Sequence, residues 1–206
     1  MYVLQRDGDP IIGVRLAELL GVTPPTVTNT LKRMARDGLV SMDEAGGTRL
    51  TDLGLDMARS VMRRHMLTEW MLMRMLKVPW SNTHSEAHHM EHSISEAIEE
   101  QMRTNLGDPQ LCPHGNPLPG YEAVTSSWIP LDDIEQDQVV IIRCIHETAE
   151  DNPDFLKFLE ANGIIPGARA EICEVLPFNQ TLTLLIGINK VTLGYSAAKY
   201  IYVEIA

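Results

Sequence analysis

The 206-residue sequence lacks three features that would each assign it to a particular class of protein. It has no apolar run of about 18 residues, so we expect no segment to span a membrane. The first residues, MYVLQRDGDP, lack the basic start and apolar stretch of a secretory signal peptide. The three cysteines, Cys112, Cys144 and Cys173, are scattered and odd in number, which indicates reduced thiols and not a disulfide framework. These absences predict a cytoplasmic protein.

Positive charge is also scarce, since 17 Lys and Arg face 28 Asp and Glu, a net charge of −11. Such a balance argues against a nucleic-acid partner unless the charge is unevenly distributed. It is uneven: residues 1–64 carry nine basic and eight acidic side chains, whereas residues 65–110 carry three and seven, and residues 111–206 five and thirteen. The N-terminal third, at +1, can therefore still approach a phosphate backbone.

That N-terminal third has the pattern of a helix-turn-helix. Residues 14–20, VRLAELL, have helical apolar spacing, and a three-residue turn follows. In the next helix, PPTVTNTLKRMARDG, Thr23 is a good N-cap, Pro24 suits the first helical position, and Gly38 ends the helix. Strands at residues 39–42 and 48–51, joined by a turn at residues 43–47, form a hairpin that reads as a wing. Two short helices with a tight turn and a wing are typical of DNA-binding domains.

The second of these helices carries side chains suited to DNA. Small hydroxyls and an amide can reach base edges and phosphates, and basic side chains can neutralise phosphates. The predicted DNA-binding residues are Thr23, Pro25, Thr26, Thr28, Asn29, Lys32 and Arg33. The alternative is a small helical bundle with a polar face and no DNA partner.

The centre of the chain gathers metal-ligand residues at helical spacing. We predict one helix over residues 52–76, ended by Pro79, and a second from about residue 81 to residue 105. On the first, His65 and Glu69 are four apart and share a face. On the second, the four-residue spacing of His84, His88 and His92 places them on one stripe, and Glu91 joins it.

Two antiparallel helices of this kind can hold cations between them in two groups. One group would be His65, Glu69 and His84, and the other His88, Glu91 and His92. Imidazoles with a carboxylate suit first-row divalent metals such as Mn(II), Fe(II), Co(II), Ni(II) or Zn(II). We expect no thiolate to join either group, which excludes a sulfur-rich structural zinc site. His89 points away and is interpreted as a surface residue. The alternative is a solvated, charged helix face.

Several segments together resemble the diphtheria-toxin-repressor family of metal-dependent transcriptional regulators, which includes iron-dependent and manganese-transport regulators. The segments are LAELLGVTPPTVTNTLKRMARDGLV, LTDLG, VMRRHMLTEWML, HSEAHHMEHSISEAIEEQM and CPHGNPLPG. The resemblance implies that His65, Glu69 and His84 form the family's ancillary metal site, and that His88, Glu91 and His92 belong to its primary site. It also implies a homodimer that binds double-stranded operator DNA.

The sequence departs from the family pattern in two places. His88 stands where iron-responsive members have a cysteine and manganese-responsive members a glutamate, so the usual indication of metal identity is lost. The family also takes a primary-site ligand from a helix ahead of MYVLQRDGDP, a segment that is largely missing from this sequence. We expect either that the true start lies upstream or that water or another group completes the primary site.

The C-terminal third has the pattern of a small β domain. Residues 107–120, GDPQLCPHGNPLPG, predict a stiff loop, and Cys112 and His114 within it are too few to bind a metal by themselves. VVIIRCI, ARAEICEVL, TLTLLIGI, KVTLG and KYIYVEIA alternate like strands of an antiparallel barrel. The run FLEANGIIPGARAEICEV resembles the SH3-like domain of ferrous-iron transport protein A. By that resemblance Asp151 and Asp154 are candidate ancillary-site ligands; alternatively both only cap a short helix.

We therefore predict a mainly α protein with a small β part: a winged helix-turn-helix domain at residues 1–60, a helical metal-binding and dimerisation domain at residues 61–120, and an SH3-like barrel at residues 136–206. The predicted function is a repressor of metal-ion homeostasis genes, activated by Fe(II) or Mn(II) in the cell, with Zn(II), Co(II) or Ni(II) able to bind in vitro. The alternatives are a metal-independent winged-helix regulator and a di-metal enzyme. The enzyme is disfavoured because neither Glu69 nor Glu91 is followed by a histidine three residues on.

Overall fold

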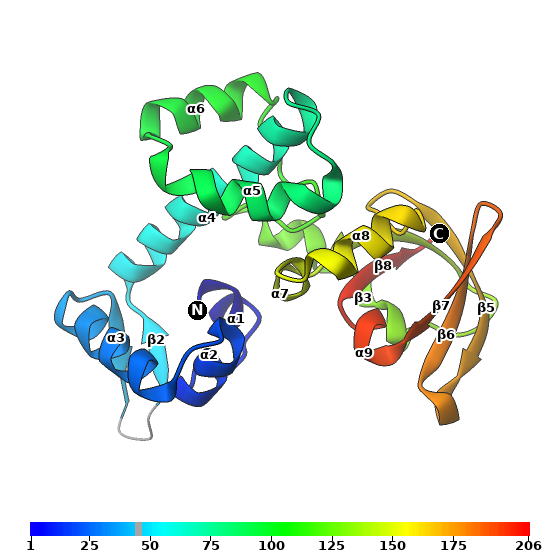
Figure 1. Cartoon of the computed structure of the whole chain (residues 1–206), viewed down its shortest axis with the longest axis horizontal. Coiled ribbons are helices and arrows are strands. Elements are labelled where there is room, and N and C mark those ends of the chain that lie inside the picture. The colour runs from blue at the N-terminus through cyan, green and yellow to red at the C-terminus, as the bar shows by residue number, and fades with distance from the viewer. Residues whose placement is uncertain (44–46) are drawn as a thin grey trace. The chain divides into compact units, whose positions relative to one another are not determined.

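The structure is a computed structural model that describes residues 1–43 and 47–206 (Figure 1). The chain forms two compact units, Met1–Met62 and Arg63–Ala206, and each is described by itself. The tip of the predicted wing, residues 44–46, lies outside the described residues. Among the described helices, none has the length and apolar content needed to cross a membrane.

The first unit is the predicted helix-turn-helix with its hairpin. Its elements are α1 (Tyr2–Arg6), α2 (Gly13–Leu20), α3 (Pro24–Arg36), β1 (Val40–Met42), β2 (Thr48–Leu50) and the start of α4 (Asp52–Arg74). The hydrophobic core of this unit is built from Leu4, Ile11, Leu16, Ala17, Val27 and Leu31. Helix α4 starts tight against the hairpin, because a Cβ on Gly54 would lie 1.9 Å from the Leu39 carbonyl oxygen. Only glycine fits there, which explains the Gly in LTDLG.

Thr23 is the N-cap residue of α3, as predicted, but its side chain does not cap the helix. Pro24 is the first helical residue and Thr23 has extended backbone angles, as expected for an N-cap. The Thr23 hydroxyl, however, lies 2.9 Å from the Thr26 hydroxyl and bonds no backbone N–H of the helix. The two hydroxyls therefore hold each other on the exposed side of α3.

The second unit begins with the rest of α4 and three shorter helical segments. These are η1 (Trp80–Asn82) with α5 (Thr83–Met90), η2 (Glu91–Ser93) and α6 (Glu96–Asn105). The expected continuous helix over residues 81–105 is therefore wrong. The chain becomes extended at Ile94, and the Ser95 side chain accepts a hydrogen bond from the Ile98 backbone N–H to start α6. Ser95 is a cap and not a further position of the histidine stripe.

The C-terminal part of the second unit is the predicted β domain. Its elements are η3 (Glu122–Thr125), β3 (Ile129–Pro130), η4 (Leu131–Asp133), β4 (Val139–Ile145), α7 (Glu147–Glu150), α8 (Pro153–Ala161), β5 (Arg169–Leu176), η5 (Pro177–Asn179), β6 (Thr181–Ile186), β7 (Asn189–Gly194), α9 (Tyr195–Ala198) and β8 (Ile201–Ile205). The six strands form one antiparallel sheet in the order β3-β8-β4-β5-β6-β7. The alternating strands bury one side: Ile142, Ile172 and Leu184 are fully buried. Together the two units confirm a mainly α chain with a small β part.

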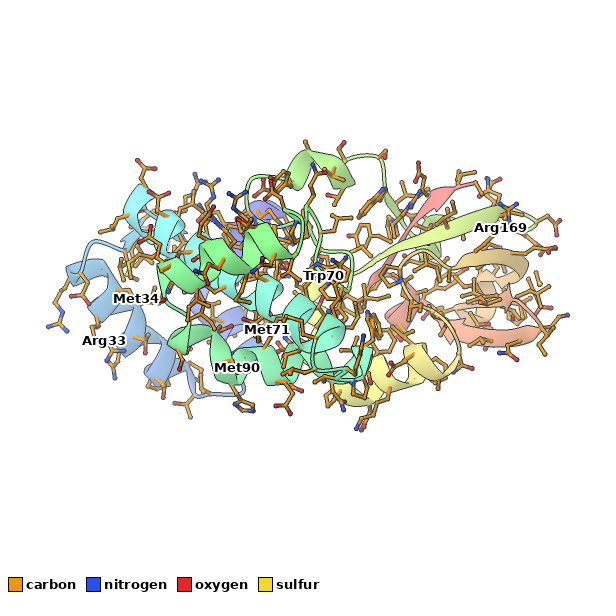
Figure 2. All side chains as sticks on the ribbon, turned by 90° about the horizontal axis from the view of Figure 1, so that it is seen from above. Arg33, Met34, Trp70, Met71, Met90 and Arg169 are labelled. Carbon is orange, nitrogen blue, oxygen red and sulfur yellow. The ribbon has the colours of Figure 1, made fainter. Side chains whose placement is uncertain are left out.

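Residues 112–118, within the predicted stiff loop, lie in the interior of the second unit. Cys112 through Leu118 are all buried, and Leu111 pairs with Pro117 in an isolated β-bridge. The indole N–H of Trp70, which Figure 2 labels on α4, donates to the Leu111 carbonyl at 2.7 Å. The loop is therefore packed inside the second unit, where its side chains face the predicted metal ligands of α4 and α5.

Candidate metal centre

Three of the predicted ligands converge in what we call the inner cluster. The Nδ1 atom of His84 lies 3.0 Å from His65 Nε2 and 3.2 Å from Glu69 Oε1, and the last two atoms are 3.1 Å apart. His65 and Glu69 point the same way because they are one helical turn apart on α4, and α5 supplies His84. The structure thus brings together all three residues of the predicted ancillary group.

Two further side chains, which sequence analysis did not select, complete the inner cluster. Glu150 Oε2 lies 2.7 Å from His84 Nδ1, and His114 Nδ1 lies 3.4 Å from Glu69 Oε1 and 3.5 Å from Glu150 Oε2. Glu150 ends α7, a four-residue helix without a periodic pattern, so no local signal identified it. His114 lies in CPHGNPLPG, where the closeness of a cysteine and a histidine was the available sequence signal for a metal ligand.

A thiol also reaches the inner cluster, which corrects the expectation that none would. Ligand atoms of Glu69, Cys112 and His114 all lie within 4.8 Å of one another, and all three residues are buried. Burial and the nearby carboxylates of Glu69 and Glu150 raise the pKa of Cys112 well above its usual value. Without a cation to stabilise the thiolate, Cys112 is therefore a neutral thiol.

Two buried polar atoms of the inner cluster lack hydrogen-bond partners and could instead bind a cation. Among the described side chains, Glu69 Oε2 and His114 Nδ1 are buried without a hydrogen-bond partner. A buried polar atom in that condition carries a desolvation penalty of about 1–3 kcal/mol. A divalent cation would satisfy both atoms, and its positive charge would offset the two carboxylates.

Protons take the place of that positive charge in the metal-free protein. Burial lowers the pKa of His65, but hydrogen bonds to Glu69 and Glu91 outweigh burial and raise the pKa to about 9. His84 is likewise desolvated, yet its contacts with Asp151, Glu150 and Glu69 raise its pKa to about 12. The pKa of Glu69 is held well below its ordinary value, because nearby histidines outweigh its complete burial. Cation binding must displace these protons.

The loop at residues 112–118 also positions its neighbours. The Asn116 side-chain N–H₂ donates both to the Ile145 carbonyl and to Glu150 Oε1, which leaves Oε2 facing the inner cluster. Gly115 has a φ of +92°, and a Cβ there would lie 2.0 Å from the Arg143 carbonyl oxygen. The glycine therefore lets the loop pack directly against strand β4.

Trp80 and Glu160 join the start of α5 to the β domain. The Glu160 carboxylate accepts the backbone N–H of Trp80 at 3.0 Å and the hydroxyl of Ser81 at 2.6 Å. The Trp80 ring lies in the hydrophobic core of the β domain and donates its indole N–H to the Pro113 carbonyl at 2.9 Å. His114 packs beside that ring, with centroids 4.6 Å apart. These contacts fix the helix that carries His84 relative to the helix that carries Glu150.

An outer cluster forms around Glu91. His88 Nδ1 and His92 Nε2 each lie 3.4 Å from Glu91 Oε1, while the other oxygen, Oε2, lies 2.7 Å from His65 Nδ1. The three atoms that come within 4.8 Å of one another belong to His65, His88 and Glu91, and this set does not include His92. His65 therefore contacts both clusters, one with each ring nitrogen. His88 and His92 are mostly exposed, at 69% and 72% of their side chains.

The remaining candidates lie at the rim or away from the clusters. Asp151 Oδ1 is 3.4 Å from His84 Nε2, the nitrogen on the side away from the inner donors. Asp154 is 95% exposed, and its Oδ1 atom lies 4.0 Å from Lys157 Nζ. His89 is exposed, as expected. Asp151 thus contacts a ligand of the inner cluster, whereas Asp154 only faces solvent at the start of α8.

The predicted DNA-facing side chains share one exposed surface of the first unit. Every one of them is exposed on or just before α3, and Arg33 projects from this helix in Figure 2. They are Thr23, Pro25, Thr26, Thr28, Asn29, Lys32 and Arg33. Val27 and Leu31 point the other way, into the core. Lys32 and Arg33 are exposed and form no ion pair within the described part of the chain, so both charges face solvent.

Three family models match the chain in succession. Residues 1–48 match the N-terminal DNA-binding domain of iron-dependent repressors, and residues 51–120 match their metal-binding and dimerisation domain. Residues 129–205 match the FeoA domain.

Individual proteins agree with these matches. The iron-dependent repressor IdeR of Mycobacterium leprae (strain TN) is 32% identical, over 99% of this chain and 93% of that protein. Among solved structures, a manganese-dependent transcriptional repressor in complex with manganese has a TM-score of 0.83 at 29% identity, covering 96% of this chain and 92% of the other. ScaR with bound Zn²⁺ has a TM-score of 0.82 at 28% identity, over 100% and 98% of the two chains.

Proposed function

Because the chain belongs to the family of iron-dependent repressors, a family of metal-dependent transcriptional regulators, we propose that its inner and outer clusters bind the activating cation. The protein acts as a homodimer on double-stranded operator DNA in the cytoplasm, and it is a regulator without enzymatic activity. In this proposal, residues 1–60 form the DNA-binding domain, residues 61–120 form the metal-binding and dimerisation domain, and residues 136–206 form the β domain that supplies Glu150.

The convergence of the inner cluster carries this proposal. Donor atoms from α4, α5, the loop at residues 112–118 and α7 meet within hydrogen-bond distances, although these segments are far apart in sequence. The proposed inner ligands are His65, Glu69, His84, His114 and Glu150, with Cys112 beside them. Buried charge at this density persists in proteins where it is paired or coordinates a metal.

The outer cluster is the second proposed cation site. Glu91 is its central ligand, with His88, His92 and the shared His65 around it. These histidines and the carboxylate form a nitrogen- and oxygen-rich donor set that suits Fe(II) or Mn(II) in the cell, while Zn(II), Co(II) and Ni(II) bind tighter in vitro by the Irving–Williams order. His88, unlike a cysteine or glutamate, adds no negative charge to this site.

A bound cation would supply positive charge that ties together the carboxylates of Glu69 on α4, Glu91 on η2 and Glu150 on α7. Helix α4 begins in the first unit, and its second half carries His65 and Glu69, so ordering of the clusters acts on the helix that follows the DNA-binding hairpin. In a homodimer two α3 helices enter successive major grooves about 34 Å apart. Bases are read by Thr23, just before α3, and by Pro25, Thr26, Thr28 and Asn29 on that helix, while phosphates are bound by Lys32 and Arg33.

The test uses a duplex enriched from a random-sequence pool by the Mn(II)-loaded protein. Mn(II) should strengthen binding to this duplex, and excess chelator should abolish the gain. We expect His88→Ala and His92→Ala to lose the metal response with folding unchanged by circular dichroism. A mutant that responds to Mn(II) as the wild type does contradicts the role of the outer cluster. Full-strength, sequence-specific binding in chelator would favour the metal-independent regulator instead.

A further inference from the structure

The donor atoms of the inner cluster are closed off from solvent. The side chains of Glu69 and Glu150 are 1% and 2% exposed, and His114 is fully buried. His84 is the most exposed member, at 18% of its side chain. A cation that reaches the inner cluster therefore passes the ring of His84.

A small cavity with several polar side chains in its lining lies on the outer side of that ring. It has a volume of about 170 Å³, and His84 and Glu150 form its inner wall. Ser85, His89 and Asp151 line its rim, and all three are exposed. All of these residues belong to the second unit, so the cavity lies within one compact body.

The dimensions and chemistry of this cavity suit a cation that still carries water. Since a water molecule takes about 30 Å³ of liquid volume, the cavity holds roughly five. Its wall offers carboxylate oxygens, imidazole nitrogens and a hydroxyl, the donors that replace water around a first-row divalent ion. Asp151 adds a negative charge at the rim, which draws cations from solution.

His84 presents one ring nitrogen to the inner cluster and the other to the cavity. Its Nδ1 atom faces Glu69, Glu150 and His65, whereas its Nε2 atom faces Asp151 across 3.4 Å. We propose that the cavity is the access port of the inner cluster, a transient site where a partly hydrated divalent cation is held by Asp151 and the histidines before it moves past His84. This inference rests on the proposed function, because it assumes that the inner cluster binds the cation.

An access port differs from a ligand in its kinetic signature. A residue that only lines the route changes the rates of binding and release together, whereas a residue that holds the bound ion changes the equilibrium. His89 and Ser85 line the port and are not ligands of either cluster. The test therefore measures association of CoCl₂ by stopped-flow absorbance and release by a chelator chase, in full-length protein carrying His92→Ala to weaken the outer cluster.

In this background, His89→Ala removes a rim donor and Ser85→Trp fills the cavity. We expect both variants to slow association and release by about tenfold while the Kd stays within about twofold. Glu86→Ala is the matched control, because Glu86 is exposed on the same helix and does not line the cavity. Its rates should equal those of the background protein, and urea unfolding checks that Ser85→Trp folds.

Two results would overturn the port. Unchanged rates in both folded variants would show that cations reach the inner cluster by another path. A weaker Kd with unchanged association would make His89 a ligand of the bound ion. A third result would contradict the proposed function itself. If the background protein folds normally but does not bind Co(II), the inner cluster is not a cation site, and the proposal of an access port is then also wrong.

Discussion

Glu69 is the residue on which the inner cluster depends most. Its Oε1 atom contacts His65, His84 and His114, its Oε2 atom has no hydrogen-bond partner in the described chain, and its side chain is almost completely buried. Mutation of a residue that only hydrogen-bonds a metal ligand commonly costs about 10–100-fold in metal affinity, and loss of a ligand should cost at least that much. The charge of Glu69 is therefore the most sensitive single feature of the site.

We predict that Glu69→Gln, which keeps the shape and removes the charge, lowers Mn(II) affinity by at least about 100-fold in calorimetric titration. The surface variant Glu86→Gln should bind as the wild type does. The same loss in both variants would mean that overall charge, and not the inner cluster, governs affinity.

The histidine pKa values set the pH dependence of the metal-free fold. The pKa of His65 is raised to about 9 in the folded chain, against about 6.5 in an unfolded one. A raised pKa contributes stability that is complete below the unfolded value and lost as pH rises through the folded value. The metal-free protein should therefore lose stability between about pH 6.5 and pH 9, which urea titrations at several pH values measure. No loss over this window in wild type, or the same loss in His65→Ala, would contradict the assignment.

The affinity for cations should rise with pH, whereas the stability of the metal-free protein falls. Because bound protons must leave His65 and His84, Co(II) affinity should rise with pH across the same window. Histidines with ordinary pKa values would compete with the cation only below about pH 6. The carboxylates around both rings raise their pKa values, so protons compete with the cation up to a higher pH. Calorimetry in buffers of different ionisation enthalpy counts the released protons, and a count of zero would contradict this account.

At the scale of elements, the break between α5 and α6 and the contact between η1 and α8 decide how the ligands are presented. Histidine spacing alone favoured one long helix, because residues 83–93 are compatible with helix throughout. The Ser95 cap ends that pattern and turns α6 away. Glu160 then holds the start of α5 against the β domain through Trp80 and Ser81.

We predict that Glu160→Ala destabilises the second unit by about 2 kcal/mol, since hydrogen bonds to a charged acceptor contribute about 1.5–3 kcal/mol. It should also weaken Mn(II) binding, because His84 and Glu150 lose their common support. Tryptophan fluorescence during urea unfolding measures the first effect and titration the second. Glu174→Ala, an exposed glutamate of the same domain, is the matched control. Wild-type stability and affinity in Glu160→Ala would contradict the proposed support.

Helix α3 gives a separate prediction, because its exposed side chains divide into two kinds. Lys32→Ala should weaken binding to all duplexes and reduce the salt dependence by about one phosphate contact. Asn29→Ala should instead lower discrimination among sequences by about 1–3 kcal/mol. Fluorescence anisotropy with the enriched duplex and a scrambled one separates the two effects over a range of salt. Equal effects of both variants on both duplexes would contradict the division.

At the scale of the whole molecule, the sequence predicted most of the fold and half of the inner cluster. Caps, turns and strand alternation act locally, so α2, α3, the hairpin and most strands were readable. His65, Glu69 and His84 were found because helical spacing places them on defined faces. His114, Cys112 and Glu150 were missed because tertiary packing, not local pattern, brings a proline-rich loop and a four-residue helix to α4. The contacts of Trp80 and Glu160 likewise join residues 80 positions apart.

The central claim, that a cation in these clusters controls DNA binding, is tested most directly by the anisotropy of the enriched duplex under controlled Mn(II). The wild type should bind about 5- to 150-fold tighter with Mn(II) than in chelator, the range expected for an allosteric coupling of about 1–3 kcal/mol. Glu69→Gln, folded by circular dichroism, should show no such gain. Equal affinity of the wild type with Mn(II) and with chelator, or an undiminished gain in Glu69→Gln, would contradict the account.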